Sequence, residues 1–325
     1  MALVSCQLGR AQTLAQQHFY RSRVFSTTIC KAFGVNTYPT CTLERAVGEV
    51  AGSDDGLWKQ GVFDGAVYPD LPIIGPAMNA GIESQIQKQI EDEQRDGWVV
   101  RTVAAQCLSE KDIHARMERV GKLVGRAEGK GAILCVSGGD PCRKMPFWKD
   151  GAKDSVYMLQ HARKMKAQGR ISANVSLWAV ANPMLDSVDS YARKVDAGAE
   201  VFLTQPPFLP TSEEWFASVN QLSGDSNQAK ILVGVPIITS QRNLDFWIRL
   251  CGLNAKESHI EGLKKSFPGK GSGPDVFERA VIDWNTDFLQ RVAMRMPGIS
   301  GIHAMPVTGM GRRLVVDVLR EAQVT

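Results

Sequence analysis

Residues 194–208 read KVDAGAEVFLTQPPF, and this stretch indicates how the chain is built. The charged residues and Gly198 are typical of a helix end, and the apolar run 201–203 then predicts a short buried strand. The polar pair Thr204 and Gln205 follows, and two prolines end the strand because proline cannot donate to a sheet ladder. A helix that leads into a buried strand with a polar tip is the unit we find along the chain.

Similar short apolar runs, rich in Val and Ile, recur after residue 70 and predict buried parallel strands. These strands are expected at 71–75, 98–105, 132–137, 172–180, 200–205, 231–236 and 300–305. Amphipathic stretches between them predict helices at 81–95, 110–126, 154–168, 185–197, 212–222, 241–251, 275–294 and 311–322. A weaker strand at 40–45 would come before the others.

Eight βα units close into a barrel of about 250 residues, which suits the segment 40–325. We therefore expect an α/β protein with a single-domain (β/α)8 TIM barrel. The alternative is an open, doubly wound sheet. The barrel is favoured because the glycine-rich dinucleotide fingerprint is absent: the SGGD turn at 137–140 lacks its third glycine and lies in mid-chain.

The composition fits a soluble globular protein, with 44% hydrophobic and 22% charged residues among 325. No apolar run approaches the roughly 18 residues that cross a membrane, and a net charge of +4 is too small to indicate nucleic acid as a partner. The 7 cysteines form neither a CxxC pair nor a cluster with histidine, so no metal site is expected. Exposed apolar helix faces are compatible with a homo-oligomer.

Residues 1–39 differ from the rest because they are rich in Ser and Thr and contain no acidic residue, while their basic residues include Arg21 and Arg23. An Arg-rich, Ser-rich and acid-poor start is typical of an organelle transit peptide. We therefore expect a leader that directs the protein to a mitochondrion or plastid, followed by the barrel domain at 40–325. The alternative is a disordered or non-native extension on a cytoplasmic protein.

In a barrel of this kind, functional residues lie at the carboxyl ends of the strands. The polar residues expected there include Asp140, Asn182 and Gln205, and His303 lies within the last strand. Glycines before Asp140 would let a flat ligand approach the backbone, and the Gln205 amide suits the edge of a heterocycle. The alternatives are that Asp140 only caps the next helix and that His303 is a hydrogen-bonded core residue.

Five segments resemble, in this order, the methylenetetrahydrofolate reductase family. They are ILCVSGGDP, WAVANP, ARKVDAGAEVFLTQPPF, ILVGVPIITSQRNLDFW and GIHAMP. The resemblance extends from about residue 98 to residue 319 and is weak before that. It implies a barrel that carries FAD and reduces 5,10-methylenetetrahydrofolate to 5-methyltetrahydrofolate with electrons from NAD(P)H, a reaction of one-carbon metabolism.

The resemblance also implies roles on the cofactor side of the site. Gly139 and Asp140 match the family's Gly-Asp turn, whose aspartate lies near the flavin ring and acts in catalysis. Arg193 and Lys194 match the basic pair that holds the phosphate side of the flavin, a role that suits cations. Asn182 matches the loop beside the ribityl chain.

On the substrate side, Gln205 resembles the glutamine that hydrogen-bonds the pterin, and Phe208 would line the same face. The family places its general acid, a glutamate, on the first strand. Glu44 in CTLERAV is the best match, because it precedes the next expected strand by one βα unit of about 30 residues. The alternative is an ordinary glutamate at a helix start.

Three departures from the family pattern leave a second hypothesis open. Gly138 stands where many members have arginine, Ala104 where a histidine is often found, and residues 304–306 lack the usual tyrosine and asparagine. The chain could thus be a reductase-fold protein that binds folate or flavin without this reaction, such as a methyltransfer partner subunit. A barrel enzyme with another substrate is the third hypothesis.

Overall fold

The computed structural model describes most of the barrel segment. The described residues are 38–45, 61–70, 76–91, 97–105, 108–137, 154–222, 229–269 and 273–322. The leader expected at 1–39 lies outside them up to residue 37, as do the expected strand 71–75 and the turn with Gly139 and Asp140.

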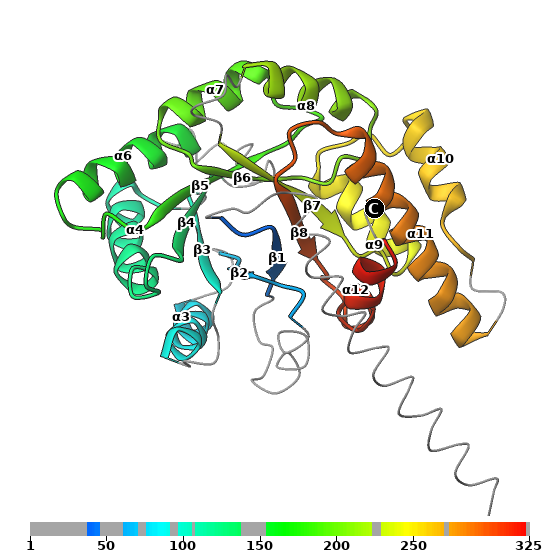
Figure 1. The fold of residues 1–325 in the computed structure, drawn as a ribbon, viewed down its shortest axis with the longest axis horizontal. Helices are drawn as coiled ribbons and strands as arrows, with labels where there is room; N and C mark the ends of the chain where they lie inside the picture. The colour runs from blue at the N-terminus through cyan, green and yellow to red at the C-terminus, as the bar shows by residue number, and fades with distance from the viewer. Residues whose placement is uncertain are drawn as a thin grey trace, which may run out of the picture.

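Eight parallel strands form a closed barrel in which each strand pairs with the next and the last pairs with the first (Figure 1). They are β1 (Cys41–Glu44), β2 (Gly65–Tyr68), β3 (Trp98–Ala104), β4 (Gly131–Val136), β5 (Ser176–Ala181), β6 (Val201–Thr204), β7 (Lys230–Pro236) and β8 (Gly301–Met305). The predicted (β/α)8 barrel is confirmed. The open, doubly wound sheet is excluded, because its first and last strands would not pair.

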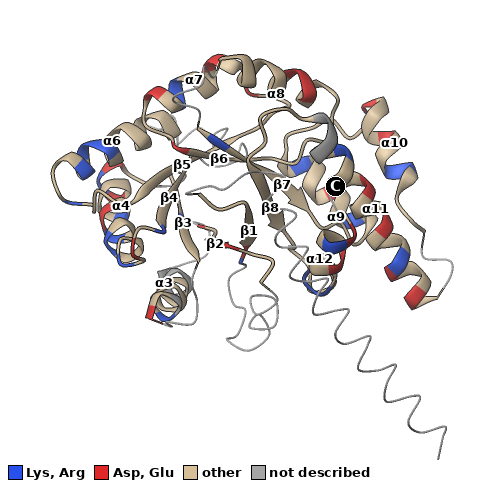
Figure 2. Ribbon diagram, in the orientation of Figure 1, with Lys and Arg blue, Asp and Glu red and all other residues tan. Residues whose placement is uncertain are grey.

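Helices surround the barrel on its outer side (Figure 1). They are α3 (Pro76–Glu91), α4 (Glu110–Val124), α6 (Ser155–Ala167), α7 (Val188–Asp196), α8 (Thr211–Leu222), α9 (Gln241–Leu250), α10 (Ser258–Ser266), α11 (Pro274–Arg295) and α12 (Gly309–Glu321). Figure 2 shows that charged residues gather on these outer helices. Helices such as α4 and α12 also bury apolar residues, as their amphipathic sequences predict.

The second strand and one helix differ from the sequence prediction. The strand expected at 71–75 is wrong as a barrel strand, because Gly65–Tyr68 forms β2 and pairs with both β1 and β3. A Cβ atom on Gly65 would lie 2.9 Å from the Thr42 Cγ2 atom and 3.0 Å from the Trp98 Cβ atom, so only glycine fits there. Helix α10, which was not predicted, buries only Ile260 and so gives little apolar periodicity.

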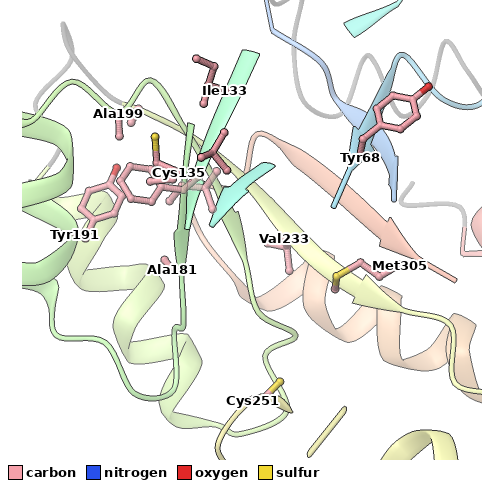
Figure 3. Packing of buried hydrophobic residues seen from close by; sticks show 14 of the residues in the cluster. Tyr68, Ile133, Cys135, Ala181, Tyr191, Ala199, Val233, Cys251 and Met305 are labelled. Carbon is pink, nitrogen blue, oxygen red and sulfur yellow. The ribbon is translucent and has the colours of Figure 1, made fainter. Parts of the chain in front are cut away.

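Two apolar layers hold the barrel together. Alternate strand residues face inward and form a cluster that includes Val67, Leu134 and Leu232. The opposite faces pack against the helices in a larger cluster, and Figure 3 shows members from strands, such as Tyr68 and Val233, together with Tyr191 of α7. The barrel interior is thus a packed core, which leaves its two ends as the places where polar groups can gather.

Aromatic rings close the amino end of the barrel. The Trp98 ring lies 5.7 Å from the Trp178 ring, and the Tyr38 ring stacks on Trp98 at 5.8 Å, measured between centroids. The Tyr38 hydroxyl donates to a Glu200 carboxylate oxygen at 3.1 Å. This apolar end leaves the carboxyl ends of the strands as the polar face.

Candidate functional site at the carboxyl end of the barrel

Glu44, His303 and Thr42 form a connected group inside the barrel. The His303 Nδ1 atom lies 2.9 Å from the Thr42 hydroxyl oxygen, and its Nε2 atom lies 3.5 Å from the Glu44 Oε2 atom. The side chain of His303 is 3% exposed and that of Glu44 is 29% exposed. The histidine is therefore buried, and the carboxylate lies between it and solvent.

The strand register explains why these three side chains meet. Thr42 of β1 lies beside His303 of β8, and Glu44 is two residues further along β1 on the same inward face. On the other side of His303, Gly234 of β7 occupies the neighbouring position. A Cβ atom at Gly234 would lie 2.1 Å from the Thr204 carbonyl oxygen, so this position accepts no side chain. The imidazole ring accordingly has a glycine on one side and hydrogen-bonding groups on the other.

A second polar group lies at the ends of β5 and β6. The Asn182 Nδ2 atom donates to the Cys251 carbonyl oxygen at 3.0 Å, and the Cys251 thiol contacts the Gln205 Oε1 atom at 3.6 Å. Burial raises the pKa of Cys251 to about 12, so its sulfur keeps the proton that it donates to Gln205. Because the thiol contacts the Gln205 Oε1 atom, it does not use the two N–H donors of that amide.

The side chains of the predicted basic pair, Arg193 and Lys194, point in different directions. Lys194 is buried, and its Nζ atom donates to the Val180 carbonyl oxygen at 2.8 Å and to the Asp186 Oδ2 atom at 3.3 Å. Arg193 is exposed. Consecutive helix residues lie about 100° apart around the axis, so the two side chains diverge. Within the described residues, the Lys194 ammonium is used to join β5 to α7.

Phe208 lies close to this second group in sequence but is itself a core residue. Its side chain is 7% exposed, and its ring lies 5.6 Å from that of Phe288, between centroids. The predicted contact of Phe208 with a pterin stays a prediction. Gly139 and Asp140 lie outside the described residues, so their predicted roles are likewise not tested.

Sequence reasoning missed a buried ion pair beside the mouth. Asp70 follows β2, accepts the backbone N–H of Ala104 at 3.0 Å, and pairs with Arg116 at 2.6 Å. The Asp70–Arg116 ion pair holds the end of β3 at Ala104. This is the position where members of the family that the sequence resembles often have a histidine. The sequence prediction placed the second strand at 71–75, which begins after Asp70. The position of Asp70 at a strand end is seen only in the structure, where β2 is 65–68.

Two kinds of feature are absent from the part of the chain that the structure describes. No group of three or more His, Cys, Asp or Glu residues there is arranged to hold a metal ion. No helix there is both long and apolar enough to span a lipid bilayer.

The fold defines the class of protein as a parallel (β/α)8 barrel, and a comparison with one solved structure agrees. An uncharacterized protein from Clostridium thermocellum, described as binding two copies of 5-methyl-5,6,7,8-tetrahydrofolic acid, is 11% identical and covers 88% of this chain and 96% of its own, with a TM-score of 0.56. A thermostable xylanase mutant from Cellvibrio japonicus is 8% identical and covers 88% and 98%, with a TM-score of 0.47. Neither a family model nor a curated protein matches the chain. At 11% identity the likeness to the first of these structures shows the fold alone.

Proposed function

We propose that this chain binds a reduced folate across the carboxyl mouth of the barrel and uses Glu44 as its proton donor. The observation that carries the proposal is the position of Glu44 at the end of β1. Its carboxyl group is partly exposed and contacts the buried His303 of β8. The resemblance implies a general acid at the end of the first strand. The folate ligand of the similar barrel from Clostridium thermocellum supports the same ligand class.

The two polar groups suit the two edges of a pterin. Strand β5 lies four strands around the ring from β1, so the Asn182–Gln205 group follows strands on the opposite side of the barrel from Glu44. The N–H donors of Gln205 can meet acceptors on one edge of the ring, while Glu44 delivers a proton near the one-carbon unit. Such a donor contributes about 10² to 10⁴ in rate when it is well placed.

The finer proposal is that the chain reduces 5,10-methylenetetrahydrofolate to 5-methyltetrahydrofolate with FAD and electrons from NAD(P)H. The flavin would supply hydride transfer, and this chain's residues would bind the folate, orient it and move the proton. Lys194 does not fit the role of holding a flavin phosphate, because its ammonium is buried and paired with Asp186. The exposed Arg193 is the described member of the pair that a phosphate can reach.

The position of Lys194 favours a second candidate function. A barrel that binds folate without a flavin needs no pair of converging cations, and it could present 5-methyltetrahydrofolate to a methyltransfer partner. Both functions predict folate binding at the mouth, and they differ in whether the protein takes up FAD and oxidises NAD(P)H.

Glu44→Gln tests the proposal directly. We expect the purified protein to bind 5-methyltetrahydrofolate in calorimetry, and, in the flavin form, to show a flavin spectrum that 5-methyltetrahydrofolate bleaches without oxygen. The Glu44→Gln protein should keep its flavin content and lose about 10² to 10⁴ in turnover, because glutamine cannot give up a proton. Glu214→Gln, on the exposed side of α8, is the matched control and should change nothing.

Each outcome decides between the candidates. A colourless protein that takes up no FAD but binds 5-methyltetrahydrofolate supports the second function and removes the first. Binding of neither ligand overturns the proposal. Unchanged turnover in the Glu44→Gln protein would remove Glu44 as the proton donor.

A further inference from the structure

We infer that His303 is the positioning residue of Glu44 and that Thr42 holds the imidazole ring in place through its other nitrogen. The inference deepens the proposed function and rests on it, since it concerns the proton donor of that site. Both ring nitrogens of His303 face polar groups of the same strand, β1, at positions two residues apart. The imidazole therefore bridges the barrel interior and the carboxyl group at the mouth.

The partners of the ring assign its protons. A neutral imidazole carries its hydrogen on one nitrogen and accepts with the other. To act as a donor behind Glu44, the ring needs its hydrogen on the Nε2 atom, which faces the carboxyl group. The Nδ1 atom then accepts the hydroxyl hydrogen of Thr42, whose side chain is fully buried. The Thr42 hydroxyl can thus serve as the hydrogen-bond donor to the tautomer that donates to Glu44.

The contact between the His303 Nε2 atom and Glu44 is long. The 3.5 Å separation between Nε2 and Glu44 Oε2 is at the outer limit of a hydrogen bond, and such contacts often tighten when a ligand binds. A donor behind one carboxyl oxygen orients the other oxygen toward the mouth. Removing that donor should therefore reduce the chemical step more than ligand affinity.

Two substitutions at His303 separate positioning from simple packing. His303→Gln places an amide nitrogen near the position of Nε2 and keeps a donor toward Glu44, whereas His303→Asn places it near Nδ1 and removes that donor. We expect His303→Asn to lower kcat about tenfold with KM for the folate unchanged, the size of one net hydrogen bond. We expect His303→Gln to restore most of kcat.

A nuclear magnetic resonance experiment tests the coupling without any folate. The chain has 5 histidines, so His303→Asn assigns the ring nitrogens of His303 in a ¹⁵N spectrum. We expect one Nε2–H tautomer in the unaltered protein, a shifted Nε2 resonance in Glu44→Gln, and a changed Nδ1 resonance in Thr42→Val. Glu214→Gln should leave both resonances in place.

The outcomes separate this inference from the proposed function. An Nδ1–H tautomer, or a ring that does not respond to Glu44→Gln, overturns the inference even if folate is turned over. Equal loss of kcat in the His303→Gln and His303→Asn proteins also overturns it, because packing alone would then explain the loss. A protein that shows the coupled resonances but binds no folate overturns the proposed function and leaves the Glu44–His303–Thr42 coupling standing.

Discussion

At the scale of the residue, a few positions inside the barrel are fixed by contact with backbone. Gly234 is one such case, because a Cβ atom there would lie 2.1 Å from the Thr204 carbonyl oxygen and 2.8 Å from the Met305 Cε atom. Met305 is the end of a flexible side chain and could move. The carbonyl oxygen belongs to β6, so a larger residue at Gly234 would have to push two paired strands apart.

Gly234→Ala should therefore destabilise the protein by about 1–3 kcal/mol, the usual range for an overpacked core. The matched control is Gly262→Ala in α10, where no atom lies within 4 Å of the added Cβ. That substitution should raise stability by roughly 0.5–1 kcal/mol, since alanine favours a helix. Urea denaturation midpoints measure both. A Gly234→Ala protein as stable as the unaltered protein would contradict the expected clash with the Thr204 carbonyl oxygen.

The candidate site could be predicted from sequence only in part at this scale. Glu44 was placed correctly at the end of the first strand by its CTLER context and by the family resemblance. Its partner His303 was not linked to it, because the contact spans 259 residues and arises only from the pairing of β1 with β8. Cys251, a buried residue in an apolar run, gave no signal that it would join Asn182 to Gln205.

At the scale of the element, helices α4 and α6 meet through two stacked histidines. The rings of His114 and His161 lie 3.3 Å apart between centroids and are nearly parallel, at 3°. The His114 Nε2 atom contacts the Tyr157 hydroxyl at 2.8 Å, and that hydroxyl donates to Glu110. Burial lowers the pKa of His161 below its ordinary value of 6.5, and the nearby His114, Arg170 and Lys164 lower it further, while Glu110 opposes them.

This contact should make stability depend on pH. A histidine whose pKa is lowered by folding binds its proton more readily in the unfolded chain, so protonation favours unfolding. The effect is absent above the unfolded pKa of about 6.5 and grows as the pH falls below it toward the folded pKa. His161→Phe keeps an aromatic ring on His114 and removes the titration.

We expect the unaltered protein to lose stability between about pH 6.5 and 5 and the His161→Phe protein to lose less of it, as measured by thermal unfolding. His259→Phe, on the exposed start of α10, should behave like the unaltered protein. Parallel pH curves for all three proteins would show that the stacked pair does not couple to folding.

Most elements could be predicted because their patterns are local. Seven of the eight strands appear where apolar runs predict them, and Ser109 caps α4. The exception, β2, is only four residues long and begins with a glycine that Thr42 and Trp98 require. The sequence prediction favoured the longer apolar run at 71–75. The neighbours that require the glycine lie on other strands, so the local sequence of β2 does not reveal them.

At the scale of the whole molecule, the amino end of the barrel is sealed by residues that come just before β1. Tyr38 stacks on Trp98 and donates to Glu200, and Asp64 accepts the backbone N–H groups of Thr40 and Cys41. Burial raises the pKa of Asp64, and these N–H donors oppose that rise. The barrel therefore includes Tyr38. Proteolytic removal of a leader would have to occur before Tyr38 to preserve these contacts.

The seal can be tested with two substitutions of Tyr38. Tyr38→Ala removes both the ring stack and the bond to Glu200 and should cost about 2 kcal/mol or more. Tyr38→Phe keeps the stack and should cost about 1 kcal/mol, the size of one hydrogen bond. Urea denaturation measures both losses. A Tyr38→Ala protein with an unchanged midpoint would mean that the barrel begins after this residue.

The pairing of β1 with β8 has a consequence for how the protein is made. Synthesis delivers Glu44 early and His303 late, and local β-strand pairs can form on the ribosome long before the ring closes. During that interval β1 presents an open edge, and the carboxyl group at the mouth has no histidine behind it. The last strand to emerge thus closes the barrel and completes the Glu44–His303 pair in a single event, so a nascent chain has no assembled site.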